Sequence, residues 1–237
     1  IAGCGTGQHS IGTATRFKSS NVLAVDLSLS SLAYAKRKTE ELAVESIEYM
    51  QADILDLRKL EGQFDIIESA GVLHHMDDPM SGWKVLTGCL KGGGLMKIGL
   101  YSELARLNIV RAREEIALLE LGTSGAEIRK FRQSLIESSN EEHKQLTEFG
   151  DFFSMSMLRD LIFHVQEHRF TLPLIQSCLD QLGLVFCGFE DQDLVTQFKD
   201  FHLDKVDVLD LESWHNFERF NPATFVNMYQ FWCQKRG

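Results

Sequence analysis

Short apolar runs alternate with longer segments of helical periodicity over the first hundred residues of the chain. The predicted strands lie at residues 22–25, 47–50, 64–69 and 95–101, and the predicted helices lie at residues 10–19, 30–42 and 79–90. Ile1-Ala2 is long enough only for the stub of a first strand, so we expect the chain to be incomplete at its N-terminus. Strands that alternate with helices indicate a parallel sheet with helices on both faces.

The alternation stops after residue 101. Residues 102–171 have helical periodicity and no convincing strand, which predicts a helical insertion that acts as a lid over the carboxyl edge of the sheet. The clearest helices of this part lie at residues 105–121, 126–135 and 160–168.

The strand and helix pattern resumes at residue 172. Its predicted elements are a helix at 172–182 that ends at Gly183, a strand at 184–189, an acidic helical stretch at 204–220 and a last strand at 227–234. The pattern predicts one α/β domain over residues 1–237, with a doubly wound, mostly parallel sheet. Residues 1–101 form its first half, the helical insertion follows strand five, and residues 172–237 complete the sheet.

Composition narrows the class of protein. Apolar residues make up 44% of the 237 positions, which is enough for a sizeable core, and no apolar run is long enough for a membrane span. The formal net charge of −10 disfavours a nucleic-acid partner, because such proteins usually present a basic face. Five scattered cysteines without a C-x-x-C pair predict reduced thiols in a cytoplasmic protein, and no metal site.

Three glycines stand at alternate positions in the run Gly3-Cys4-Gly5-Thr6-Gly7. This spacing lets the backbone turn sharply and approach a ligand without a Cβ in the way. An aspartate follows each of the next two predicted strands, at Asp26 and at Asp53. Ligands of open α/β sheets bind at the carboxyl ends of the strands, so these groups predict a nucleoside site there.

Nicotinamide cofactors are the competing interpretation of the glycine run. Their fingerprint is G-x-G-x-x-G. Its third glycine would fall on Gln8 or on Ser10 in this chain, so the tighter spacing disfavours NAD.

The chain resembles the class I, Rossmann-like S-adenosylmethionine-dependent methyltransferases over nearly its full length. The resemblance is carried by the glycine run, Val25-Asp26-Leu27, Gln51-Ala52-Asp53-Ile54, Phe64-Asp65-Ile66-Ile67 through His74-His75, and Leu90-Lys91-Gly92-Gly93-Gly94. Residues 99–106 and 163–173 are similar to a bacterial subfamily in which the domain often follows tetratricopeptide repeats. The resemblance implies a seven-stranded sheet whose antiparallel last strand lies beside the fifth.

The resemblance also implies a cofactor, S-adenosylmethionine, and the residues that hold it. Asp26 would accept hydrogen bonds from the ribose hydroxyls, and Asp53 would accept one from the adenine amino group. The other implied cofactor residues are Gly3, Cys4, Gly5, Gly7, Leu27, Ile54, Ser69 and Ala70. The family often has an acidic residue two places before the first glycine, where this chain has Ile1.

The sequence says less about the methyl acceptor and the catalytic residues than about the cofactor. The run after the fourth strand lacks the Asn/Asp-Pro-Pro-aromatic pattern of many N-methyltransferases, and its Val-Leu-His-His ending favours O- or C-methylation of a small-molecule or protein acceptor. His74 or His75 could act as a general base. The structural alternative is that these histidines cap the next helix or pack beside the cofactor.

Two further segments have an expected place in the acceptor pocket. Tyr101 follows the fifth strand, and His164 and His168 lie in the return from the insertion. The spacing H-x-x-E-H of the latter, with Glu167, is also a zinc-protease signature, which the methyltransferase context disfavours. A different class of function stays open, namely a module that binds the cofactor but serves only in partner recognition. The sequence does not indicate an oligomeric state.

Overall fold

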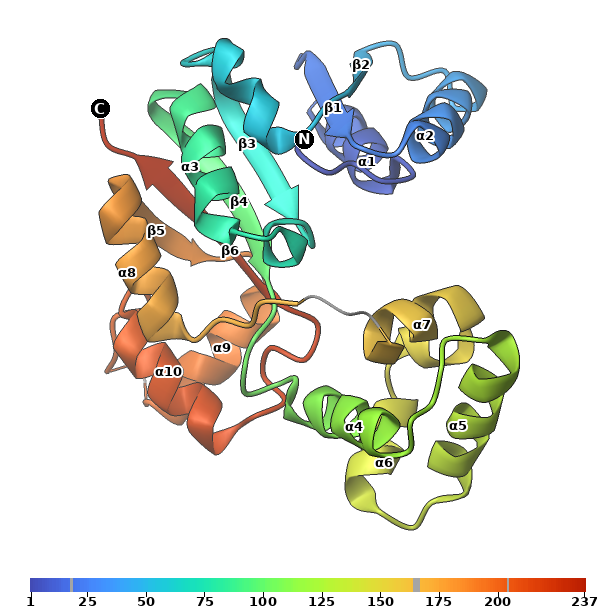
Figure 1. Ribbon diagram of the computed structural model, residues 1–237. Helices are drawn as coiled ribbons and strands as arrows, with labels where there is room; N and C mark the ends of the chain where they lie inside the picture. Colours follow the sequence, from blue (N-terminus) through green and yellow to red (C-terminus); the bar gives the residue numbers. More distant parts are fainter. Residues whose placement is uncertain (18, 164–166, 204) are drawn as a thin grey trace.

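The computed structural model describes residues 1–17, 19–163, 167–203 and 205–237, and shows a mixed sheet flanked by helices with a helical lobe beside it (Figure 1). Its strands are β1 (Val22–Asp26), β2 (Ile47–Gln51), β3 (Phe64–Ala70), β4 (Leu90–Leu100), β5 (Leu184–Phe189) and β6 (Tyr229–Lys235). The last strand, β6, runs antiparallel between β4 and β5, which confirms the prediction for the final strand.

The expected continuous sheet of seven strands is not what the structure shows. Strands β1 and β2 form a two-stranded sheet, and β3, β4, β6 and β5 form a four-stranded sheet in that order. The dipeptide Ile1-Ala2 lies between the two sheets. The amide of Ala2 donates to the carbonyl of Glu68 on β3 at 2.9 Å, and the amide of Val25 on β1 donates to the carbonyl of Ile1 at 2.9 Å. The stub thus bridges β1 and β3, but it is too short to count as a strand.

Helices flank these strands, and all but α9 lie where the periodicity predicts a helix, with shifted bounds. They are α1 (Gln8–Arg16), α2 (Leu29–Glu41), α3 (Pro79–Cys89), α8 (Leu172–Leu182), α9 (Gln192–Phe201) and α10 (Leu211–Phe220). Gly183, in the left-handed region at φ 66°, ends α8 as expected. None of the described helices is long and apolar enough to cross a membrane.

Two expectations about these elements were wrong. The strand predicted at residues 95–101 begins earlier, at Leu90, directly after α3 ends at Cys89, so the run Lys91 to Gly94 belongs to β4. Residues 204–220 were expected to be one helical stretch, whereas α10 begins at Leu211, capped by Asp210. Helix α9 had not been predicted. Its burial is confined to Leu194 and Phe198, so its periodic apolar signal is short.

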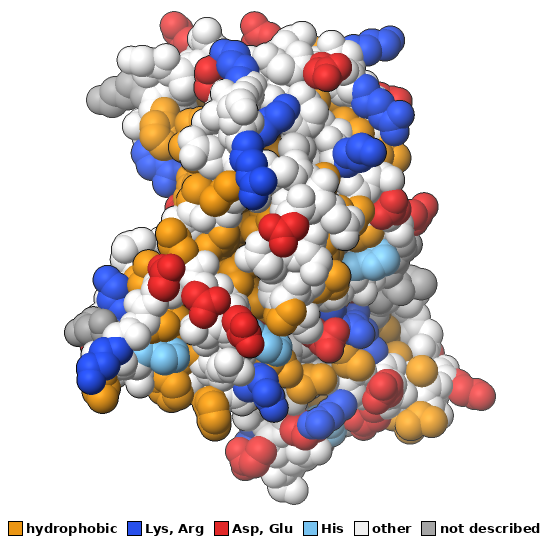
Figure 2. All heavy atoms as spheres, turned by 90° about the vertical axis from the view of Figure 1, so that its left-hand side faces the viewer, with side chains coloured by type: hydrophobic (Ala, Val, Ile, Leu, Met, Phe, Trp, Pro, Cys, Tyr) orange, Lys and Arg blue, Asp and Glu red, His pale blue; other side chains and the backbone are white. Residues whose placement is uncertain are grey.

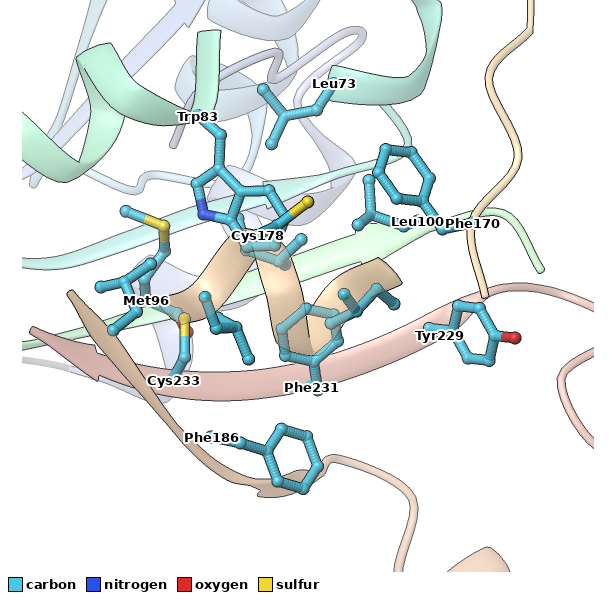
Figure 3. Close-up of a cluster of buried hydrophobic side chains, with 14 of the residues drawn as sticks. Leu73, Trp83, Met96, Leu100, Phe170, Cys178, Phe186, Tyr229, Phe231 and Cys233 are labelled. Atoms are coloured by element: carbon cyan, nitrogen blue, oxygen red, sulfur yellow. The ribbon is translucent and has the colours of Figure 1, made fainter. Parts of the chain in front are cut away.

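The core lies on both faces of the sheet. Ala24 and Val25, neighbours on β1, belong to different buried clusters, as expected where successive side chains of a strand point to opposite faces. The larger cluster surrounds β4 and β6, where Trp83 of α3 and Phe231 of β6 pack with ring centroids 6.2 Å apart (Figure 3). This packing fixes the strand ends that carry the site.

The helical insertion has a core of its own. It comprises α4 (Leu107–Leu118), α5 (Gly125–Glu137), α6 (Glu141–Thr147) and α7 (Met155–Phe163), together with a short 3-10 helix (Gly150–Phe153). Its buried side chains form a cluster separate from that of the sheet, with Ile128, Phe131 and Phe152 at its centre. A bridge between Ser102 and Phe170 joins the two ends of the insertion.

Candidate functional site

A cavity of about 620 Å³ lies at the carboxyl ends of β1, β2 and β3. Its walls come from the glycine loop and from the segments that follow these three strands. The lining residues are Gly3, Gly5, Val25, Asp26, Leu27, Ala52, Asp53, Ile54, Leu55, Gly71, Val72, His75, Met76, Asp77, Asp78 and Ser81. Ligands of open α/β sheets bind at this edge, so the fold places the cavity where a nucleoside site is expected.

The three glycines of the loop all have positive φ angles, but they differ in the space around the position of a Cβ. A Cβ on Gly3 would stand 2.2 Å from a methyl carbon of Val72, and a Cβ on Gly7 would stand 2.7 Å from the Cβ of Ala35. A Cβ on Gly5 would meet nothing within 4 Å. Gly3 and Gly7 are therefore required by close packing, whereas Gly5 presents open backbone to the cavity.

Four of the expected cofactor residues do not line the cavity. Gly7 caps α1, and Cys4 is buried in a cluster with Ala24 and Leu32. Ser69 and Ala70 end β3 beneath the cavity, and Ser69 is fully buried. These residues shape the loop and the floor of the site, and the cavity wall is formed by their neighbours.

Asp26 and Asp53 have carboxylates at the cavity. One oxygen of Asp26 accepts from the amide of Gly5 at 2.7 Å, and the other accepts from the amide of Ser28 at 2.9 Å. Asp53 accepts from the amide of Leu55 at 2.8 Å. Each carboxylate oxygen has two lone pairs, so both groups keep acceptor capacity for a ligand. The bond to Gly5 also fixes the loop against the end of β1.

The histidine pair after β3 is split between two environments. The pair lies in a short 3-10 helix (Leu73–His75), where His75 lines the cavity and His74 is fully buried. Neither ring nitrogen of His74 has a partner among the described residues. Burial, together with the nearby charges of His75 and Arg106, lowers the pKa of His74 to about 2. With so low a pKa His74 is a very weak proton acceptor, and it does not reach the cavity, so it does not suit the role of general base.

Tyr101 lies between His74 and an arginine that the sequence had not singled out. Its ring stacks on His74 with centroids 3.7 Å apart, and the guanidinium carbon of Arg106 lies 3.6 Å from its ring centroid. Arg106 in turn donates two hydrogen bonds to Glu167, at 2.9 and 2.8 Å. Arg113 donates a third to Glu167 at 2.9 Å, so one buried carboxylate joins two arginines.

The H-x-x-E-H segment does not form a metal site among the described residues. Glu167 is occupied by the two arginines, and His168 is not part of a helix. The expected helix to residue 168 was therefore wrong at its end, and His164 lies outside the described residues. No group of described histidine, cysteine or acidic side chains could hold a metal ion. His168 instead donates its backbone amide to the carbonyl of His74 at 2.8 Å.

Sequence reasoning missed Arg106 and Arg113. Both lie at the start of the insertion, far along the chain from the partner that they share, so no local spacing relates them to Glu167. The structure brings His74, His75, Tyr101 and His168 together beside the cavity, and it ties that cluster to the insertion through the buried ion pairs.

Comparison with known proteins places this architecture. Residues 2–94 match the family model described as a methyltransferase domain. An uncharacterized protein from Synechococcus is 30% identical over 200 residues, which cover 81% of this chain and 48% of that protein. A ubiquinone biosynthesis O-methyltransferase from Marinobacter nauticus is 30% identical over 150 residues, 61% of either chain. The chain thus spans about half to three fifths of the length of these relatives.

Solved structures share the fold. PKMT2 from Rickettsia typhi superposes with a TM-score of 0.73 at 15% identity, covering 100% of this chain and 49% of that chain. A structure of the same protein in complex with AdoHcy gives a TM-score of 0.71 at 16% identity, with the same coverage. An S-adenosylmethionine-dependent methyltransferase from Mesorhizobium loti gives 0.53 at 17%, covering 99% and 88%. Residues 2–94 thus match a methyltransferase-domain model, and the chain as a whole shares its fold with these solved structures.

Proposed function

We propose that the protein transfers a methyl group from S-adenosylmethionine to a small-molecule or protein acceptor. The observation that carries the proposal is the cavity that brings Gly5, Asp26 and Asp53 together at one sheet edge. Two carboxylates suit the hydroxyl and amino donors of an adenosine, and the open backbone at Gly5 leaves room for close approach. The O-methyltransferase relative supports O-methylation over N-methylation.

The residues of the cavity would divide the cofactor between them. Asp26 would accept from the ribose, Asp53 from the adenine amino group, and Leu27, with 65% of its surface exposed, would cover the adenine face. The bound cofactor supplies an activated methyl group on a sulfonium, so positioning of the acceptor provides much of the rate.

The acceptor would lie toward His75 and Tyr101. His75 lines the cavity, and its ring lies edge to face with Tyr101 at 5.8 Å between centroids. His168 approaches from the return of the insertion. These groups would orient the acceptor, and His75 is the better placed of the two histidines for moving a proton, because it reaches the cavity and His74 does not.

Calorimetric titration with S-adenosylhomocysteine tests the cofactor site. We expect Asp26→Ala to weaken binding by about 30-fold or more, since it removes charge-assisted hydrogen bonds worth about 2–3 kcal/mol. Asp210→Ala is the matched control, because Asp210 also accepts from two backbone amides, at the start of α10 away from the cavity. Absence of binding by the parent, or equal binding by the Asp26 variant, would refute the proposed site.

Turnover separates the enzyme from the alternative of a partner-recognition module that only binds the cofactor. The burial of His74 outside the cavity is the observation that favours this alternative. Production of S-adenosylhomocysteine from S-adenosylmethionine, with a metabolite or protein pool as acceptor, supports the enzyme. Tight cofactor binding without production in any pool supports the module.

A further inference from the structure

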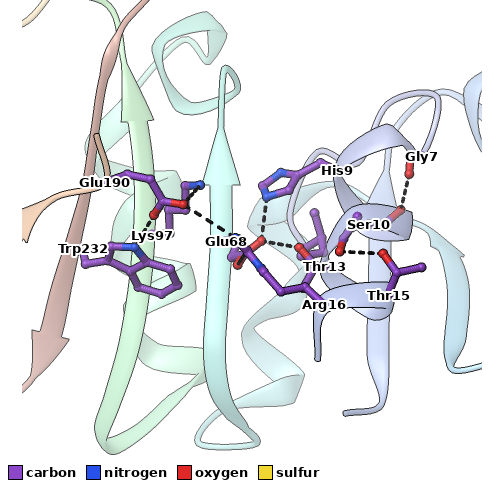
Figure 4. A network of polar contacts seen from close by, with 12 residues as sticks. Gly7, His9, Ser10, Thr13, Thr15, Arg16, Glu68, Lys97, Glu190 and Trp232 are labelled. Atoms are coloured by element: carbon purple, nitrogen blue, oxygen red, sulfur yellow. Dashed lines mark hydrogen bonds and ion pairs between the residues drawn. The ribbon is translucent and has the colours of Figure 1, made fainter. Parts of the chain in front are cut away.

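Glu68, in the middle of β3, contacts the chain on both sides of the glycine loop, through its backbone before the loop and through its buried carboxylate after it. Figure 4 shows the side-chain contacts with α1. The side chain of Glu68 is 1% exposed. Its backbone carbonyl accepts from the amide of Ala2, immediately before the loop, at 2.9 Å. Its side chain accepts from the hydroxyl of Thr13 at 2.8 Å and lies 2.6 Å from the imidazole of His9, both on the helix that follows the loop.

The surroundings of Glu68 keep it charged. Burial alone would raise its pKa, but the hydrogen bonds from His9 and Thr13 and the positive charges of His9 and Lys97 outweigh burial and hold the pKa below the ordinary value. Arg16 adds a cation at 3.6 Å. Figure 4 shows the arrangement, with α1 contributing three partners of the carboxylate across the gap from β3.

The network extends away from the loop to a second carboxylate. Arg16 also lies 3.8 Å from Glu190, which pairs with Lys97 on β4 at 3.0 Å and accepts from the indole of Trp232. These ion pairs link α1 to β4 and β6. A buried charge is costly unless its partners are well arranged, so an apolar side chain would be the simpler choice for helix packing alone.

The contacts point to a specific use for this charge. The loop begins after Ala2, whose amide donates to the backbone carbonyl of Glu68, and it continues into α1, where Thr13 and His9 contact the carboxylate. We propose that Glu68 is the positioning residue of the cofactor loop, holding residues 3–7 in the shape that presents the Gly5 backbone to the cavity. This inference rests on the proposed cofactor site.

Glu68→Gln tests the proposal, because it keeps the size of the side chain and removes its charge. Asp65→Asn is the matched control, since Asp65 is on the same strand and pairs with Lys91 at 2.7 Å but is 80% exposed. We expect S-adenosylhomocysteine to bind Glu68→Gln about tenfold more weakly, as for loss of hydrogen bonds to a charged group, and to bind Asp65→Asn as it binds the parent.

Amide hydrogen exchange of the ligand-free protein gives a readout that is independent of binding. We expect faster exchange in residues 3–9 of Glu68→Gln, with the core amides of β4 unchanged. Uniformly faster exchange, or parent-like exchange with parent-like affinity, would overturn the positioning role. If the parent itself does not bind the ligand, the proposed cofactor site fails, while the exchange result still decides whether Glu68 holds the loop.

A second variant keeps the test valid if Glu68→Gln does not fold. His9 is 31% exposed, so His9→Ala removes one partner of Glu68 at little cost to the core. We expect a smaller loss of affinity, about threefold, and faster exchange confined to the loop and the first turn of α1. Affinity and loop exchange equal to those of the parent would contradict the proposal.

Discussion

The two sides of the site are built in opposite ways. On the proposed cofactor side, Asp26 and Asp53 each accept from the amide two residues further along the chain, and Asp26 also accepts from the amide of Gly5 in the glycine loop. The cavity there is open to a ligand. On the proposed acceptor side, Tyr101 packs against the guanidinium of Arg106. Arg106 is held in turn by Glu167, which lies 61 residues further along the chain, and both side chains are buried. One side is made of local turns and the other of contacts between the sheet and the insertion.

The two sides also differ in how many charged and polar groups they bury. The acceptor side holds two arginines on one carboxylate, and buried nitrogens of His74 and His168 have no partner among the described residues. Over the outer surface, Figure 2 shows acidic and basic side chains interspersed on one face of the molecule. The cofactor part of the proposed site therefore depends on backbone shape. The part that would select an acceptor depends on the buried ionic junction of Arg106, Arg113 and Glu167.

The largest effect is expected where that junction is broken. Glu167→Ala leaves Arg106 and Arg113 buried without their shared partner, which costs about 3–5 kcal/mol in the free energy of unfolding. Denaturant unfolding measures this loss. Glu142→Ala is the control, because Glu142 pairs with Arg111 on the exposed surface of the same insertion, where a pair contributes about 1 kcal/mol or less.

Equal losses of unfolding free energy in the two variants would contradict the distinction between the buried junction and the surface pair.

The affinity of the cofactor site should change little in either variant. We therefore expect Glu167→Ala, measured below its unfolding transition, to bind S-adenosylhomocysteine within about threefold of the parent, because Glu167 does not line the cavity. A loss as large as that of Asp26→Ala would show that the two sides are coupled.

The next effect concerns acid stability. The folded protein holds His74 neutral with its pKa near 2, while the unfolded chain takes up a proton at about pH 6.5, so the unfolded state binds more protons between these values. Stability should therefore fall as pH falls below about 6.5, by up to about 1.4 kcal/mol per pH unit from this residue.

His74→Phe isolates that contribution. Phenylalanine keeps an aromatic ring against Tyr101 and has no nitrogen to protonate. The difference in unfolding free energy between the parent and the variant should shift by about 2 kcal/mol in favour of the variant between pH 6.5 and pH 5. Denaturant unfolding at the two pH values measures it, and parallel pH profiles would mean that His74 already titrates normally in the folded protein.

The same division explains what the sequence could predict. The glycine loop, Asp26 and Asp53 follow strand ends in a regular alternation, and the pattern was sufficient to place them at one edge. The junction was not predictable in this way, because Arg106 meets Glu167 only after the insertion has folded back. Glu68 was missed for a related reason, since it lies within an apolar strand and its partners come from α1.

Strand and helix bounds show where local patterns are weaker. The glycines after α3 have the composition of a helix terminator, yet pairing with β3 draws residues from Leu90 onward into β4. The two-residue stub gave too little pattern for a strand, and the structure shows it only as a bridge between β1 and β3. In both places the pairing with a neighbouring strand decides the structure, and the local sequence does not.

The smallest effects separate two glycines of one loop. Gly7→Ala should cost about 2 kcal/mol in unfolding free energy, because a left-handed backbone is combined with a clash against Ala35. Gly5→Ala should cost about 1 kcal/mol, because it has the same left-handed backbone but its new Cβ meets no other atom. The order should reverse for S-adenosylhomocysteine affinity, since only Gly5 lines the cavity and its new methyl group would stand in the way of the ligand. Unfolding and calorimetric titration of both variants give the two orders, and the same order in both measurements would place Gly5 away from the cofactor.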